Sequence, residues 1–270
     1  MKKKVKTTAL SLMLLAVLPV TACSDHGRKD KEPDSLTEEA LDGLMRSIAE
    51  GKASAFASMC DYPLPRPYPL RAIEDSAMMV DYFPVMVDDS LRQVMKNASS
   101  DDWECFGWRG WTLPGREYVW YDGGVQYVTY ESEAEKGLRS ILAREELETL
   151  NPEYREGWSP VSAMTEREGG KLFRIDSSGD SYRLMQFEDA GKTGGNPDLL
   201  LTGTMHREGS AQLSVYCFGD STGVSVTYIP DGEEPLRLWF SYPDGAKDEV
   251  RVIPVYWRDY VKFGKSKENQ

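Results

Sequence analysis

Histidine and cysteine are both scarce in this chain. It holds two histidines and four cysteines, which are His26, His206, Cys23, Cys60, Cys105 and Cys217. Zinc and copper sites usually combine several His or Cys ligands, and no C-x-x-C pair occurs, so the sequence predicts no metal and no cofactor. Acid–base chemistry would fall to carboxylates or tyrosines. Three aspartates are conceivable in that role, although nothing in the sequence pairs them: Asp81, Asp102 and Asp122.

Basic charge is also in short supply. The chain carries 32 Lys and Arg against 44 Asp and Glu, a formal net charge of −12. Nucleic-acid binding requires a positive surface that replaces counterions, so the sequence predicts no nucleic-acid partner. Docking onto anionic lipid by charge alone is excluded for the same reason.

Long apolar runs are absent apart from one near the N-terminus. Four lysines precede it, and it extends for about a dozen residues from Thr8 to Val20. A bilayer-spanning helix needs roughly 20 apolar residues, so this run is typical of a cleaved signal peptide, residues 1–22. The residue that follows this run and its small residues is Cys23. It is either a lipid-attachment site or an incidental cysteine after an ordinary signal peptide.

The residues Val20-Thr21-Ala22-Cys23 resemble the end of a bacterial lipoprotein leader. The resemblance implies cleavage before Cys23 and acylation of its amine and thiol, for example with palmitate, which would tether the chain to a membrane. The residue after Cys23 is Ser24, and in this respect the chain resembles lipoproteins that are forwarded to the outer membrane of a Gram-negative bacterium. We therefore expect a lipid-anchored protein of the cell envelope, whose mature form has 28 basic against 44 acidic residues and a net charge of −16.

The first folded region is predicted to mix helices and strands, over residues 35–155, after a polar linker at 23–34. Capping boxes at Ser35–Glu38 and Ser132–Glu135 predict two helix starts. Four prolines exclude helix from 61–70, and Pro84 should kink or split a helix that begins near Asp75. From 103 to 130 the apolar residues alternate, which predicts strands.

The second region, 160–263, is predicted to be all-β, with a polar tail at 264–270. Seven strand-like runs lie between 171 and 256, separated by turn clusters and by no helix pattern. Such spacing is typical of an antiparallel sandwich or barrel. The predicted fold class is therefore α+β: N-terminal helices packed on a curved antiparallel sheet, followed by an all-β antiparallel domain.

Several short motifs resemble those of uncharacterised bacterial lipoproteins whose N-terminal domain has the nuclear transport factor 2-like fold. The stretches are Asp61–Leu64, Asp88–Leu91, Gly107–Gly110, Val119–Tyr121 and, for a β-rich partner domain, Tyr182–Leu184 with Asn196–Leu199. The resemblance covers residues 36–262. It implies a cone-shaped α+β domain and brings no assigned reaction.

Aromatic residues are concentrated between residues 103 and 130. Strand alternation would place Trp108, Tyr118 and Trp120 on one face, and Tyr82 joins them as a ligand-pocket candidate. Packing alone is the alternative explanation for these rings. In an oxidising compartment Cys60 and Cys105 are the best-placed disulfide pair, and buried free thiols are the alternative.

Two motifs that suggest chemistry fail on their context. Gly219–Gly223 fits G-x-S-x-G, but it lies between two strand-like runs and no histidine follows His206, so a hairpin turn is predicted. Asp176–Asp180 resembles the start of a calcium loop, but Ser181 and Phe187 replace the required Gly and Glu, so a turn is again predicted.

The sequence favours a non-enzymatic binding or interaction module on the membrane. The expected partners are the membrane, through lipid on Cys23, and an unknown protein, glycan or small apolar ligand. The alternative is a small-molecule-binding or hydrolytic domain that uses carboxylates in an aromatic, cone-shaped pocket. A third hypothesis is an accessory of envelope assembly that recognises glycan or protein through its β domain.

Overall fold

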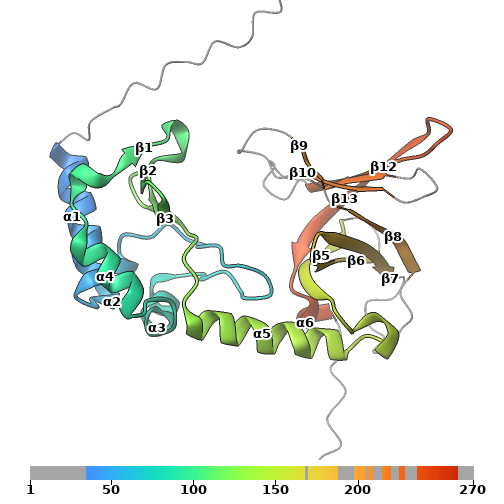
Figure 1. Cartoon of the computed structure of the whole chain (residues 1–270), viewed down its shortest axis with the longest axis horizontal. Helices are drawn as coiled ribbons and strands as arrows, with labels where there is room; N and C mark the ends of the chain where they lie inside the picture. The colour runs from blue at the N-terminus through green and yellow to red at the C-terminus, as the bar shows by residue number, and fades with distance from the viewer. Residues whose placement is uncertain are drawn as a thin grey trace, which may run out of the picture.

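The computed structural model describes residues 35–167, 170–187, 198–204, 206–208, 215–219, 225–228 and 236–260. The predicted signal peptide, Cys23, the predicted polar linker with His26, and the predicted tail lie outside these residues. Helices come first and two antiparallel sheets follow, so the α+β fold class is confirmed (Figure 1). None of the helices in the described ranges is long and apolar enough to cross a membrane.

The first domain packs four helices against a four-stranded sheet. The helices are α1 (Ser35–Ala49), α2 (Ala53–Ala57), α3 (Ser76–Met86) and α4 (Asp89–Asn97). The strands, in their spatial order, are β1 (Glu104–Cys105), β2 (Trp111–Leu113), β3 (Arg116–Tyr121) and β4 (Val125–Val128). Alternation along β3 sends Val119 and Tyr121 into a core shared with the helices.

The helical region ends between α3 and α4 at the N-cap of α4, and not at Pro84. Helix α3 continues through Pro84 to Met86, because a proline there removes only one hydrogen bond near the helix end. Asp88 then starts α4 by accepting a hydrogen bond from the Leu91 amide, 3.0 Å away. Within the region 103–130, where strands are predicted, Gly107–Arg109 instead forms a 3-10 turn, η2, and β2 begins only at Trp111.

The second domain is one nine-stranded sheet that curls until β8 lies against β10. Its strands are β5 (Ser159–Glu166), β6 (Leu172–Ser178), β7 (Ser181–Phe187), β8 (Asp198–Thr204), β9 (His206–Glu208), β10 (Val215–Gly219), β11 (Ser225–Tyr228), β12 (Leu236–Ser241) and β13 (Lys247–Val255). The short helix α6 (Trp257–Tyr260) follows.

The sequence prediction missed β5 and β9. Strand β5 lies between β6 and β13, with the order β8-β7-β6-β5-β13-β12-β11-β10-β9. It begins Ser-Pro and shows no clean alternation of apolar residues, so its burial depends on the two neighbouring strands rather than on a local pattern.

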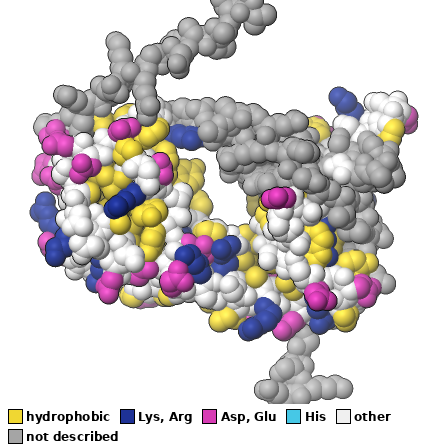
Figure 2. Space-filling view, in the orientation of Figure 1, with side chains coloured by type: hydrophobic (Ala, Val, Ile, Leu, Met, Phe, Trp, Pro, Cys, Tyr) yellow, Lys and Arg dark blue, Asp and Glu magenta, His cyan; other side chains and the backbone are white. Residues whose placement is uncertain are grey.

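Helix α5 (Glu133–Glu148) connects the two domains (Figure 1). A 3-10 turn, η3 (Pro152–Tyr154), lies between α5 and β5. In the view of Figure 2, a gap lies above α5 between the described parts of the two domains. The α5 N-cap is Ser132, whose hydroxyl accepts a hydrogen bond from the Glu135 amide at 3.0 Å, as the capping box predicts.

The Glu135 side chain does not complete that capping box. Its carboxylate accepts hydrogen bonds from Arg66 Nε at 2.9 Å and Nη2 at 2.6 Å, and both side chains are fully buried. The Tyr82 hydroxyl donates to the same carboxylate at 2.9 Å. Arg66 also donates to the carbonyls of Val128 and Tyr130. The ion pair between Arg66 and Glu135 attaches the segment with four prolines, residues 61–70, to the start of α5.

We expect Glu135→Ala to lower the free energy of unfolding by about 3–5 kcal/mol, because Arg66 would keep its charge in a buried site without a partner. Urea denaturation followed by circular dichroism measures the loss. The double variant Arg66→Met with Glu135→Leu should lose much less than Glu135→Ala alone. Equal losses for the single and double variants would contradict this explanation.

Candidate functional site: the junction between the two domains

The proline-rich segment 61–73 is a loop that runs beside α5. Its base is closed by two backbone hydrogen bonds between Leu64 and Ile73, of 2.8 and 2.9 Å. The peptide bonds Tyr62-Pro63 and Tyr68-Pro69 are cis. Arg66 binds the first turn of α5, and Tyr68 reaches the last turn. The loop thus extends from the helices toward the second domain (Figure 1).

The tip of this loop contacts helix α6 and the residue before it, Tyr256. Arg71 forms an ion pair with Asp259, and its guanidinium carbon lies 4.6 Å from the centre of the Tyr256 ring. The Ala72 amide donates to the Tyr256 hydroxyl at 2.7 Å. The two domains are therefore held together by the loop as well as by α5.

Trp257 lies at the centre of the junction and is 2% exposed. Its indole nitrogen donates to the Thr149 hydroxyl at 2.8 Å, just after α5. Its amide lies 3.4 Å from the Tyr68 hydroxyl, to which it donates. The Arg174 guanidinium stacks on its ring, with 4.9 Å between the guanidinium carbon and the ring centre.

Buried charges lie beneath Trp257. We call Tyr68, Glu146, Arg174, Asp176 and Arg183 the junction cluster. Asp176 accepts from Arg174 Nε at 2.6 Å and from Arg183 Nη2 at 2.7 Å. Glu146, Arg174 and Asp176 are fully buried, and Arg183 is 3% exposed. Burial lowers the pKa of Arg183, and the adjacent Asp176 carboxylate opposes that shift.

Glu146 and Arg174 are incompletely paired within the junction cluster, because Glu146 Oε1 and Arg174 Nη1 and Nη2 are buried without a hydrogen-bond partner among the described residues. Glu146 accepts a hydrogen bond from the Tyr68 hydroxyl at 2.9 Å, while Arg174 Nη1 stays 3.9 Å from the same oxygen. Burial raises the pKa of Glu146 to about 7, although Arg174 and Tyr68 both oppose this shift. Burial also raises the pKa of Tyr68, so that its hydroxyl remains protonated and able to donate.

The junction cluster serves to position the two domains relative to each other. It brings together elements from both domains, but its charged members are buried beneath Trp257, and most of their hydrogen bonds are made within the cluster. Within the described ranges, no three His, Cys, Asp or Glu residues are grouped so that they could hold a metal ion.

The pocket candidates do not meet at one point. Tyr118 and Trp120 share the face of β3 opposite Val119, as alternation predicts, but each packs on another ring. The ring centres of Tyr118 and Tyr130 are 5.0 Å apart, and those of Trp120 and Phe106 are 5.7 Å apart. The Tyr82 hydroxyl is bound to Glu135. Trp108 lies in η2, and its side chain lies outside the described part of the structure.

The three candidate aspartates lie on separate elements. Asp81 is exposed on α3, and Asp122 is exposed in the turn between β3 and β4. Asp102 is exposed in the 3-10 turn η1 (Ser100–Asp102), where its carboxylate accepts from the amide and hydroxyl of Ser99. That capping contact lowers the pKa of Asp102.

Cys60 and Cys105 are free thiols, so the predicted disulfide is not formed. The Cys60 thiol is buried and donates a hydrogen bond to the Phe56 carbonyl oxygen, 3.4 Å from its sulfur. Burial raises the pKa of this thiol to about 12. Cys105 is half-buried on β1. In the second sheet, the backbone register places Cys217 of β10 opposite His206 of β9.

Both rejected motifs connect adjacent antiparallel strands. Gly219 and Ser225 are register partners at the end of the β10–β11 pair, although 220–224 lies outside the described residues. Ser178 pairs with Ser181 across a turn in which Gly179 has a φ of 58°. Asp176 itself lies inside β6 and belongs to the junction cluster, not to the turn.

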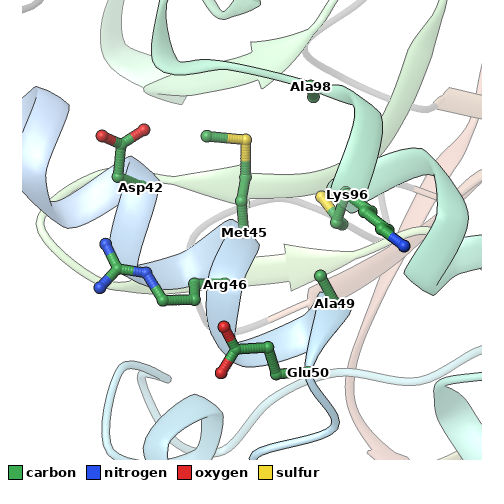
Figure 3. A pocket seen from close by; sticks show the side chains of 8 residues that line it. Asp42, Met45, Arg46, Ala49, Glu50, Lys96 and Ala98 are labelled. Atoms are coloured by element: carbon green, nitrogen blue, oxygen red, sulfur yellow. The ribbon is translucent and has the colours of Figure 1, made fainter.

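A groove of about 450 Å³ lies between α1 and α4 (Figure 3). Its lining residues are Asp42, Met45, Arg46, Ala49, Glu50, Met95, Lys96 and Ala98. The groove mixes both charges with two methionines. None of the predicted pocket residues lines it.

Sequence reasoning missed the junction cluster, although one signal was present. Arg174 and Asp176 occupy alternate positions of β6, among the apolar residues Leu172, Phe173 and Ile175, and alternate positions share a face. Two opposite charges at such positions predict a buried ion pair. Their partners Glu146 and Arg183 are identified only by the way the strands and α5 meet.

Tyr68→Phe should lower the free energy of unfolding by about 1–2 kcal/mol, because it removes a hydroxyl that bonds both Glu146 and the Trp257 amide while leaving the ring in place. Chemical denaturation monitored by tryptophan fluorescence measures the change. Tyr127→Phe, at a ring that is 55% exposed, is the control and should leave the midpoint unchanged. An unchanged midpoint for Tyr68→Phe would show that this hydroxyl does not stabilise the junction.

Compared with protein-family models, with curated proteins and with solved structures, the chain gives no match.

Proposed function

We propose that this chain is a lipid-anchored protein of the cell envelope whose folded part is a binding module of two domains held at a fixed spacing. The junction is the observation that supports a fixed spacing. Two separate connections, α5 and the proline-rich loop, join the domains. The loop contacts the buried junction cluster through Tyr68, and its tip contacts Tyr256 and Asp259. Buried charges are costly unless they stay paired, so such an interface resists sliding or rotation.

The anchor in this proposal is lipid on Cys23, and the site is the outer membrane of a Gram-negative bacterium. The support is the leader: a cationic start, a short apolar run and a cysteine where cleavage would fall. The 12 residues of the linker 23–34 can reach at most about 40 Å when fully extended. The module would therefore work close to the membrane surface.

The proposed ligand of the module is a protein or glycan rather than a small substrate. Two domains held at a fixed spacing can contact one extended partner at two places. Helix α5 also exposes Leu138 and Ile141, two large apolar side chains that lie one helical turn apart. The hydrolytic alternative has less support, because Asp81, Asp102 and Asp122 are exposed on separate elements.

Cys23→Ser should move the protein from the membrane fraction to the soluble fraction, because the thiol that carries lipid is lost. Immunoblotting of fractions washed with high salt measures the distribution. The neighbouring change Ser24→Ala is the control for expression and export. A Cys23→Ser protein that stays in the membrane fraction would contradict the proposed anchor.

Loosening the junction should weaken binding of the native partner. In the anchored protein we expect Tyr68→Phe with Arg71→Ala to reduce severalfold the partner recovered by co-purification from the native envelope, because two of the contacts across the junction are removed. Quantitative mass spectrometry of the purified complexes provides the comparison. Lys136→Ala, an exposed change on α5, is the control. If the junction variant recovered as much partner as the unmodified protein, fixed spacing of the domains would not be what binding depends on.

A further inference from the structure

We propose that the outer face of strands β12 and β13 binds an acidic glycan, with a uronic acid ring stacked on the indole of Trp239 and the sugar carboxylate paired with Arg237 and Arg251. The inference rests on the proposed function, since it names the chemistry of one contact that the binding module makes. It concerns a part of the second sheet that the junction does not use.

Alternation along two adjacent strands builds this face (Figure 1). The buried positions of both strands are even-numbered, as at Leu238, so the odd-numbered side chains point outward. The register places Trp239 opposite Glu249, and Arg237 opposite Arg251. We call these four outward-facing residues the outer patch. Trp239 is therefore half-buried among charged side chains and does not belong to the core.

Glu249 fixes the position of the indole. Its carboxylate accepts a hydrogen bond from Trp239 Nε1 at 3.2 Å and another from Arg237 Nη1 at 3.3 Å. The Glu249 side chain keeps 35% of its surface exposed, so this network lies at the protein surface. A tryptophan held in this way has little side-chain freedom left to lose when a ligand packs on its ring.

Positive charge is in excess on the outer patch. Arg237 and Arg251 lie directly opposite each other, and like charges at such positions are unfavourable in a sheet. Both arginines form ion pairs with Glu249, at 3.2 Å from Arg237 and at 3.6 Å from Arg251. Two positive charges thus share one carboxylate, on a chain whose net charge is −12. The patch is complementary to an anion, and a bound anion would relieve the repulsion between the two guanidinium groups.

A uronic acid matches both parts of the outer patch. Its pyranose ring presents a flat face of C–H groups that can pack on an indole, and its carboxylate is attached to the same ring. The guanidinium groups beside Trp239 can bind that carboxylate through paired hydrogen bonds. A stable protein partner needs about 800 Å² of contact on each side, whereas four side chains fit one or two sugar rings. These features favour a glycan over a protein as the occupant.

Isothermal titration calorimetry with tetragalacturonate, an oligosaccharide of uronic acids, tests the site in the anchored protein purified in a non-ionic detergent. We expect binding that weakens as the salt concentration rises, because exposed ion pairs are screened. The methyl ester of the same oligosaccharide keeps the rings and lacks the charges, so it should bind about tenfold more weakly or worse.

Three variants locate the ligand. Arg251→Gln removes one guanidinium and Trp239→Leu removes the indole, and each should weaken binding by about tenfold. Arg116→Gln removes an exposed arginine from β3 of the first domain and should leave binding unchanged. The Arg251 side chain is 54% exposed, so Arg251→Gln still decides the question if Trp239→Leu fails to fold.

Failure of the site and failure of the proposed function give different results. Absence of tetragalacturonate binding, or equal binding by Arg251→Gln and the unmodified protein, overturns the acidic-glycan site and leaves the fixed spacing untouched. Equal binding of the methyl ester, or of tetraglutamate, which has the charges without the sugar ring, overturns the site as well. Binding that depends on Arg251 and Trp239, with undiminished partner recovery by the variant Tyr68→Phe with Arg71→Ala, supports the site and overturns the fixed spacing.

Discussion

The pairing of buried charge along α5 is the constraint on which the arrangement of this protein depends. Glu135 at the start of the helix binds Arg66, and Glu146 near its end lies beside Tyr68 and Arg174. A charge taken out of water is costly unless its partner is held in place. The proline-rich loop supplies one partner at each end of the helix, so loop and helix together determine where the second domain lies.

This constraint turns the loop into a structural element. Proline prevents helix and strand, and the loop instead presents Arg66, Tyr68 and Arg71 in sequence along α5 and onto α6. Trp257 closes over the same contact and stacks on Arg174. A module built in this way can change the spacing of its domains only by disturbing these buried charges.

Local patterns predicted the elements better than the site. Alternation in 103–130 and in the second half predicted most strands, and Asp75 and Ser132 cap helices whose starts were predicted. Two of the predicted aromatic residues, Tyr118 and Trp120, share one face of β3 as alternation predicts, yet their rings pack on Tyr130 and Phe106. The Ser132–Glu135 motif predicted a cap and missed the role of Glu135, because a local motif carries no information about Arg66, which lies far away in the sequence.

The sequence by itself determined the α+β class, the succession of helices before strands, and the hairpin character of the two rejected motifs, since each follows from short-range periodicity and turn chemistry. The lipid anchor on Cys23 remains a prediction of the sequence. Only the tertiary structure decided which charges are buried together and that Glu146 and Arg174 keep buried polar atoms without a hydrogen-bond partner among the described residues. Burial and partner distance depend on residues brought together from the loop, α5, β6 and α6, and these quantities set the cost of each charge.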